Sequence, residues 1–175
     1  MMKSAIAVIE MRIPYSFAKT CATLGWRQVR YGLSIGLLDP GAGIDKAIDL
    51  ICEMDGSSPD VLELAGSARS DRTLHIVDRL AEAESADLEG DLLALWAYLS
   101  LAWVYEHRHY DNDPLQRVIE IISDFDYPAG VAGFVRYMPT DEPDLGSIEA
   151  NERRMLERWK EYLDESRRAF LKQSD

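Results

Sequence analysis

The chain has 175 residues, of which 47% are hydrophobic and four are Trp, and its 31 acidic and 19 basic residues give a formal net charge of −12. A chain of this length can bury most of the surface that it exposes when unfolded, so the composition excludes a disordered, collagen-like or low-complexity protein. The acidic surplus argues against nucleic acids and anionic membranes as partners, because proteins bind both through Lys and Arg.

Cysteine content and the apolar segments predict a cytoplasmic protein. The chain has two cysteines, Cys21 and Cys52, too few for a secreted disulfide scaffold, and their apolar surroundings predict small buried thiols. The apolar run Ala5–Ile9 is too short for a signal peptide. The longest apolar segment, Leu92–Tyr105, has 14 residues, whereas a membrane span needs about 18 or more.

The apolar residues of the N-terminal third recur with the period of a helix. We expect short helices at Tyr15–Leu24 and Trp26–Leu37, separated by Gly25. Asp39-Pro40 then starts a third helix, with Asp as the N-cap and Pro in the first helical position. One face of that helix is expected to be buried, and it carries Ile44, Ala47, Ile48 and Ile51.

The next two helices are marked by their ends. Ser58-Pro59 repeats the start signal, and Gly66 is expected to end the short helix that follows. A longer helix is predicted from about Asp71 to Glu84. Its apolar stripe consists of Leu74, Ile76, Val77 and Leu80.

The segment Leu88–His107 is the hydrophobic centre of the chain. A helix that is apolar on nearly every side is surrounded by other helices. The residues that make this segment apolar are Leu92, Leu93, Leu95, Trp96, Leu99, Leu101, Trp103 and Val104.

Three more helical segments follow. Asp113-Pro114 starts a helix in the same way as the earlier Asp-Pro pair. A short helix is expected at Pro128–Phe134, and a last one, capped by Ser147, runs to about Lys172. The Pro-rich and acidic segment Pro139–Gly146 is predicted to be a loop.

These elements predict an all-α protein, a bundle of seven or eight helices around a central hydrophobic helix. Residues 1–13 are predicted to be an N-terminal extension, and residues 14–175 a single helical domain. The segment Ser4–Ile13 is open between a strand and a helix.

The negative charge is concentrated in residues 61–146, which carry 17 acidic and 6 basic residues. A solvated surface and a patch that attracts a basic protein partner are both consistent with this concentration. Under the second interpretation, we expect the contacts to come from loops, where recognition usually lies. The expected contact residues are Asp111, Asp113, Asp124, Asp126, Tyr127, Asp141, Glu142 and Asp144.

Two motifs could carry chemistry. Gly32–Gly36 matches the G-x-S-x-G nucleophile elbow, but no strand precedes it, so we interpret the match at Ser34 as chance. A metal ion could be held, if a helix ends between the two histidines, by His107, His109, Asp111 and Asp113. We favour a helix C-terminus, where His and Arg meet the helix dipole, followed by Asp113 as the N-cap of the next helix.

The segment Asp124–Pro128 is dense in acidic and aromatic side chains. It can hold an inter-helix turn against the core, and an acid with an aromatic on a rigid turn is also typical of a binding hot spot. Both roles are compatible if Phe125 points inward and Tyr127 points outward. We expect a scaffold role for Phe125, Pro128, Phe134 and Met138.

Several groups of residues resemble a bacterial family of unknown function, domain of unknown function 2247. They are Trp26 with Tyr31-Gly32-Leu33, Asp113-Pro114-Leu115 with Val118 and Glu120, Asp124–Pro128, and Phe134–Pro139. The resemblance covers about residues 14–165 and is most specific from Asp113 to Pro139. It implies a small cytoplasmic protein, and members of the family that occur beside polymorphic or contact-dependent toxin genes resemble immunity proteins. The resemblance implies no catalytic residues.

We therefore predict an immunity-type protein that binds a cognate toxin domain through its acidic surface and blocks it, without catalytic residues, a metal ion or a cofactor. The toxin partner is expected to be basic. Two other functions stay open: a metal-dependent helical hydrolase that uses the histidine segment, and a helical adaptor or structural protein that binds through apolar surface.

Overall fold

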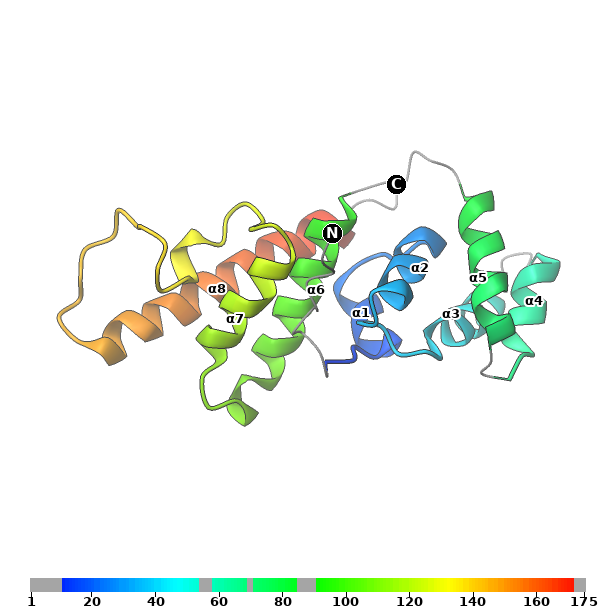
Figure 1. Cartoon of the computed structure of the whole chain (residues 1–175), viewed down its shortest axis with the longest axis horizontal. Helices are drawn as coiled ribbons and strands as arrows, with labels where there is room; N and C mark the ends of the chain where they lie inside the picture. The colour runs from blue at the N-terminus through cyan, green and yellow to red at the C-terminus, as the bar shows by residue number, and fades with distance from the viewer. Residues whose placement is uncertain (1–10, 54–57, 69–70, 85–90, 172–175) are drawn as a thin grey trace, which may run out of the picture. The chain divides into compact units, whose positions relative to one another are not determined.

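The computed structural model describes residues 11–53, 58–68, 71–84 and 91–171 (Figure 1). These residues form eight α-helices and no β-strand, which confirms the predicted all-α fold of seven or eight helices. The helices gather into two compact units, an N-terminal unit from Met11 to Leu92 and a C-terminal unit that begins at Leu93. The predicted extension lies mostly outside the described residues, as do residues 88–90, where the central helix was expected to begin.

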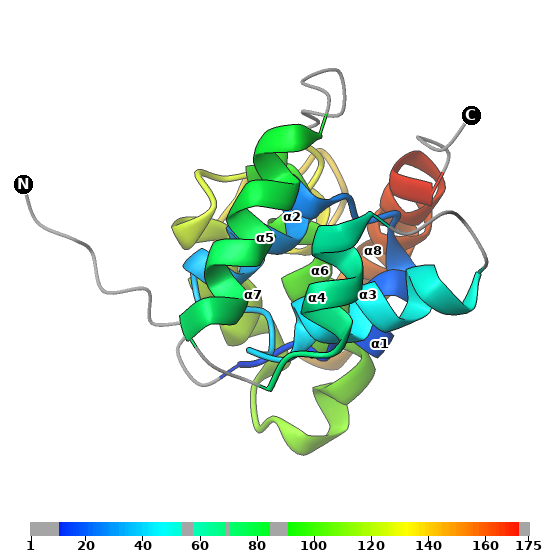
Figure 2. The same ribbon diagram turned by 90° about the vertical axis from the view of Figure 1, so that its right-hand side faces the viewer.

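The N-terminal unit contains α1 (Tyr15–Cys21), α2 (Trp26–Ser34), α3 (Ala42–Cys52), α4 (Pro59–Ala65) and α5 (Asp71–Ala83). Helix α4 packs between α3 and α5 (Figure 2), and α2 packs against both α3 and α5. The first described segment joins this unit through one parallel bridge between Ile13 and Leu38. The most deeply buried apolar residues of the unit are Ile13, Ala18, Ala22, Val29, Leu37, Leu38, Ala42, Ala47, Leu64, Ile76, Val77 and Ala81.

A carboxylate from the far end of the N-terminal unit caps α2. The N-cap residue Gly25 has no side chain to accept the first backbone N–H groups of the helix, so Glu84 accepts them instead. Its two oxygens lie 2.9 Å from the backbone nitrogens of Trp26 and Arg27. A Cβ atom on Gly25 would lie 2.6 Å from a Glu84 oxygen, so any side chain here would displace the capping carboxylate. This cap joins α2 to the end of α5.

The predicted buried face of α3 is wrong in part. Ile48 and Ile51 are 44% and 36% exposed, and the buried face instead includes Gly43 and Lys46. Lys46 turns inward because its Nζ donates to the Leu24 carbonyl at 2.6 Å, and burial lowers the pKa of this amine. Gly43 faces α5 so closely that a Cβ atom would lie 2.8 Å from a Val77 methyl. These two contacts set the orientation of α3, so Ile48 and Ile51 face solvent.

Three smaller expectations also fail. Helix α3 begins at Ala42 rather than at Pro40, because the Asp39 carboxylate accepts the Gly41 N–H and forms a turn before the helix. Leu74 is 47% exposed, and its neighbour Thr73 is buried in its place. Cys21 is buried as expected, but Cys52 is exposed at the end of α3.

The C-terminal unit contains α6 (Leu92–His107), α7 (Pro114–Asp124) and α8 (Ile148–Leu171), with two 3-10 turns, η2 (Arg108–Tyr110) and η3 (Ala132–Phe134). Only the end of the predicted helix Pro128–Phe134 is helical, as η3. None of the helices in the described part of the chain combines the length and the apolarity that crossing a bilayer requires.

Helix α6 is the hydrophobic helix that the sequence predicts at the centre. All seven consecutive residues from Leu95 to Leu101 are buried, so no face of this stretch meets solvent. Ring contacts connect α6 with α8: Tyr98 stacks on Phe170 at 5.4 Å, and Tyr105 meets Trp159 edge-on at 5.1 Å. The Trp159 ring also stacks on Phe134 of η3 at 6.1 Å.

We expect the wild type to lose stability at alkaline pH when Tyr15 ionises, and we expect the variant Tyr15→Phe to lack this loss. Burial, and then the charges of Asp49, Glu53 and Asp45, raise the pKa of Tyr15 from 10.0 to about 12. The folded state therefore retains a proton that the unfolded state releases, so this stability is complete below pH 10 and is lost as pH rises through 12. In urea unfolding, the free energy of unfolding of the wild type should fall by about 2 kcal/mol more than that of Tyr15→Phe between pH 9 and 12. An equal loss in Tyr15→Phe and in the exposed control Tyr110→Phe would contradict the assignment.

We expect Glu84→Gln to lower the free energy of unfolding by about 1–2 kcal/mol, because an amide has one acceptor oxygen and no charge for the α2 N-terminus. Glu82→Gln is the matched control, since Glu82 is exposed and lies on α5. Urea unfolding and amide hydrogen exchange at Trp26 and Arg27 measure the effect. Equal stabilities of the two variants would show that the carboxylate cap contributes nothing.

Candidate functional site

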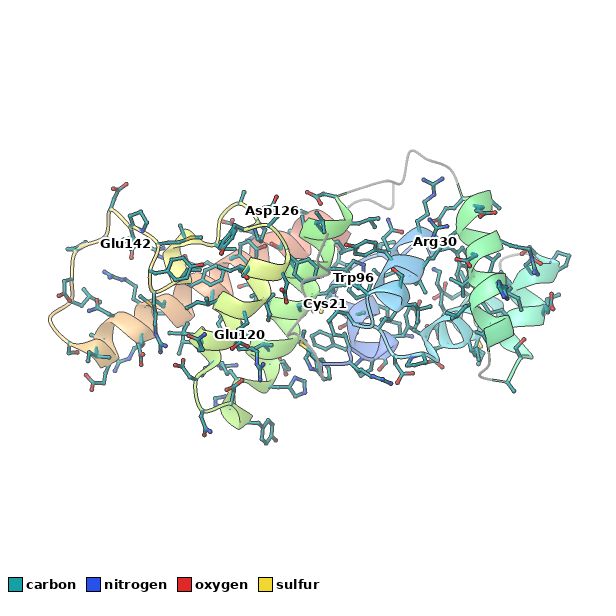
Figure 3. The ribbon with its side chains drawn as sticks, viewed as in Figure 1. Cys21, Arg30, Trp96, Glu120, Asp126 and Glu142 are labelled. Atoms are coloured by element: carbon teal, nitrogen blue, oxygen red, sulfur yellow. The ribbon has the colours of Figure 1, made fainter. Side chains whose placement is uncertain are left out.

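All eight residues that the sequence predicts as partner contacts lie in the C-terminal unit, on three segments, and Figure 3 labels two of them, Asp126 and Glu142. The first segment precedes α7, the second consists of the last residue of α7 and the turn after it, and the third is the loop before α8. They are, respectively, Asp111 and Asp113; Asp124, Asp126 and Tyr127; and Asp141, Glu142 and Asp144.

The acidic residues before α7 are engaged within the protein. Asp113 caps α7 as predicted, since its carboxylate accepts the Gln116 N–H at 3.1 Å. Arg136 donates to Asp113 and to Glu152 of α8, each at 2.7 Å. The hydrogen bond from Arg136 lowers the pKa of Asp113 below its usual range. Asp111 accepts the Asp113 N–H and lies 3.5 Å from Arg117, so both predicted contacts hold the structure together.

The acidic loop before α8 is fastened to that helix. Glu142 forms ion pairs with two arginines one turn apart, Arg154 at 2.9 Å and Arg158. Arg154 also donates to the Pro143 carbonyl at 2.6 Å. Asp144 accepts from Asn151 at 2.7 Å and from the Gly146 N–H at 2.9 Å, and these hydrogen bonds lower the pKa of Asp144. The charge of Glu142 is therefore balanced inside the unit.

The turn after α7 confirms the predicted orientation of its aromatic residues. Phe125 is 6% exposed and belongs to the core, whereas Tyr127 is 49% exposed. The Tyr127 N–H donates to the Ile122 carbonyl at 2.9 Å, which closes the helix end as in a Schellman motif. Asp124 at the end of α7 is half-buried, and Asp126 is exposed.

This turn has an unusual backbone. Asp126 and Tyr127 have φ angles of 55° and 52°, a left-handed conformation that is unfavourable by about 1 kcal/mol or more for each non-glycine residue. At every other described position with positive φ, the residue is glycine: Gly36, Gly130 and Gly146. Glycine at position 126 or 127 would therefore remove this unfavourable backbone energy.

A second exposed tyrosine, which the sequence does not single out, lies after η3. Tyr137 is 54% exposed. Partial burial, and then the neighbouring Tyr127 side chain, raise the pKa of Tyr137. The available signal is its place in the Phe134–Pro139 stretch that resembles the family.

Fewer carboxylates of the predicted surface are available to a partner than the number of acidic residues suggests, because several pair with arginine. Asp111, Asp113 and Glu142 each face arginine. Among the described residues, no ion pair involves Asp126 or Asp141, and both are exposed. Asp144 accepts hydrogen bonds only from neutral groups, so negative charge also remains at this exposed carboxylate.

The segment proposed for a metal ion has other contacts. His107 Nδ1 lies 2.8 Å from the Trp103 carbonyl, and the imidazole packs on the Trp103 ring at 3.9 Å. Within the described ranges, no group of three or more His, Cys, Asp or Glu residues is arranged to hold a metal ion. Ser34 lies in the last turn of α2 and donates to the Tyr31 carbonyl, so the G-x-S-x-G match is not a strand-to-helix elbow.

Fold and candidate site together define a small all-α protein with an exposed acidic and aromatic turn. A family described as an uncharacterized protein conserved in bacteria (DUF2247) matches residues 15–167, and the chain belongs to this family. No curated protein and no solved structure matches the chain.

We expect Glu142→Gln to loosen the loop 139–147 from α8, because the loop loses its charge-assisted contacts with Arg154 and Arg158. Thermolysin should then cut several times faster at the exposed Leu145. The free energy of unfolding should change by only about 1 kcal/mol, since these ion pairs are partly solvated. Asp141→Asn is the control with the same change in charge, and equal cleavage of the two variants would contradict the role of Glu142.

Proposed function

We propose that this protein is an immunity-type protein of the cytoplasm, which binds a cognate bacterial toxin domain through its acidic surface and neutralises it. The observation that carries the proposal is the turn after α7. It presents the exposed residues Asp126 and Tyr127 in a left-handed backbone that lacks glycine. Retained strain of this kind is typical of sites under a functional constraint.

The charge of the C-terminal unit supports a basic protein as the partner. Residues 93–171 carry 15 acidic and 9 basic residues, and several of the arginines are held by carboxylates of the same unit. Such a surplus attracts a cationic partner over about a Debye length, near 10 Å at moderate ionic strength, and repels acidic proteins. Neutralisation would follow from occlusion of the toxin's own site, which needs no catalytic residue, metal ion or cofactor here.

A helical adaptor that binds through apolar surface is the alternative with an observation in its favour. Leu145 in the loop before α8 and Ile148 at the start of α8 are 50% and 74% exposed. Binding through these side chains would depend little on salt, because apolar burial is not screened. Salt dependence therefore separates the two functions.

The first experiment identifies the partner. The tagged full chain is recovered from its native bacterium at low salt, and co-purifying proteins are identified by mass spectrometry. A stoichiometric basic protein, above all a toxin C-terminal domain from a neighbouring gene, supports the proposal. Repeated recovery of the chain alone under toxin expression contradicts it.

We expect association with the toxin to slow about tenfold or more when NaCl rises from 20 to 300 mM, because the attraction between opposite charges is screened. The double variant Asp126→Asn with Asp141→Asn should lower the rate at low salt. The matched control, Glu157→Gln with Glu165→Gln on exposed positions of α8, changes the net charge equally. Stopped-flow fluorescence measures the rates, and an affinity independent of salt would remove the electrostatic basis.

A further inference from the structure

Two large apolar side chains at the beginning of α8 face solvent. Leu145 in the loop before α8 is 50% exposed, and Ile148, the first residue of α8, is 74% exposed. No residue of α8 before Trp159 is buried, so this end of the helix contributes no fully buried side chain to the core. In Figure 1, the loop and the first turns of α8 extend beyond α6 and α7. Packing of the unit therefore does not explain these two side chains.

The segment 139–149, here named the α8 arm, is ordered by polar contacts with α8. The Leu145 N–H donates to the Asn151 side chain at 3.1 Å, and the Glu142 carboxylate pairs with Arg154 at 2.9 Å. The other apolar side chain belongs to the first turn of the helix itself. A surface that is ordered before binding loses little conformational entropy when a partner docks. Both apolar side chains are therefore presented on a preorganised backbone.

The charge of the α8 arm decides which partner fits its apolar side chains. The arm has four acidic and no basic residues. Glu142 is paired with arginine. No ion pair among the described residues involves the other three, Asp141, Asp144 and Glu149, which are exposed. An uncharged apolar partner would remove water from these carboxylates without pairing them, which costs free energy. A Lys or Arg side chain can instead lay its aliphatic stem on the apolar residues and keep its charge beside a carboxylate.

We propose that the α8 arm is the docking surface for a cationic segment of the protein partner, with Leu145 and Ile148 as apolar anchors. This inference rests on the proposed function and specifies where its partner binds. Protein interfaces commonly combine a few apolar anchors with charged residues at the rim. The three carboxylates accelerate association with a cationic partner, and burial of the anchors slows dissociation.

The test titrates the full chain, ¹³C-labelled at its Ile and Leu methyl groups, with a designed amphipathic helical peptide of Leu and Lys. We expect the methyl signals of Leu145 and Ile148 to shift with saturation. The control is Leu62 of α4, which is 54% exposed and whose two acidic neighbours in the chain are paired with Arg79. Its signal should move much less. Absence of binding, or equal shifts at Leu62, would overturn the proposal.

Two further peptides separate charge from apolar contact. Replacement of every Lys by Glu should abolish binding, because the arm is acidic. Replacement of every Leu by Ser should raise the Kd about tenfold or more, because the anchors lose their apolar partner. Equal affinity of the original peptide and of either replacement would show that the arm does not recognise a cationic apolar segment.

Variants of the anchors test the arm without a change in the core. Leu145→Ser with Ile148→Ser should raise the Kd of the Leu–Lys peptide about tenfold, and Leu62→Ser should leave it within about twofold. Circular dichroism verifies folding of both. An unaltered Kd in the folded double variant would reject Leu145 and Ile148 as anchors.

Variants of the carboxylates test the choice of a cationic partner. Asp141→Asn with Glu149→Gln should raise the Kd of the same peptide about threefold or more, because attraction to Lys is lost. Glu157→Gln with Glu165→Gln, on exposed positions farther along α8, changes the net charge equally and should have a smaller effect. The same Kd in both variants would contradict a local role of the arm.

Partner capture distinguishes this proposal from the proposed function. If a toxin domain is captured equally well by the wild type and by Leu145→Ser with Ile148→Ser, the docking surface is wrong and the immunity function stands. If the Leu–Lys peptide binds the α8 arm as expected but no toxin domain is ever captured under toxin expression, the docking surface stands and the immunity function is wrong.

Discussion

The buried indole of Trp159 is the contact on which the C-terminal unit depends. Helix α8 is otherwise a charged helix, and Trp159 is its only buried residue. Its ring meets Tyr105 of α6 and Phe134 of η3, so one side chain joins the long helix to the hydrophobic centre and to the segment after α7. This packing places Glu152 beside Arg136 and Arg154 beside Glu142, and the loops of the candidate site are held by those pairs.

Arginines decide which part of the acidic surface is available to a partner. A surplus of acidic residues suggests a broad negative patch, but ion pairs within the unit occupy Asp113 and Glu142. Because a carboxylate beside a guanidinium contributes little long-range field, attraction of a partner depends on the carboxylates outside these pairs. Asp126 lies next to the exposed Tyr127, which joins charge and aromatic surface in one turn.

The confirmed predictions rest on interactions between residues close in the sequence, whereas the wrong ones depend on contacts between distant segments. The N-caps at Ser58, Asp113 and Ser147 are confirmed, because each bond joins a side chain to a backbone N–H three residues later. The inward Phe125 and outward Tyr127 are confirmed as well. The faces of α3 and α5 are predicted from periodicity alone, which cannot include the inward turn of Lys46 toward Leu24.

The amino-acid sequence by itself determined the all-α class, the apolar helix α6 and the helix starts, because these depend on residues within one or two helical turns. Only the tertiary structure decided that Glu84 caps α2 from 58 residues away, that Arg136 neutralises Asp113, and that Glu142 pairs with two arginines of α8. The physical reason is that such contacts form between segments whose approach is set by packing of the whole core, so no local pattern records them.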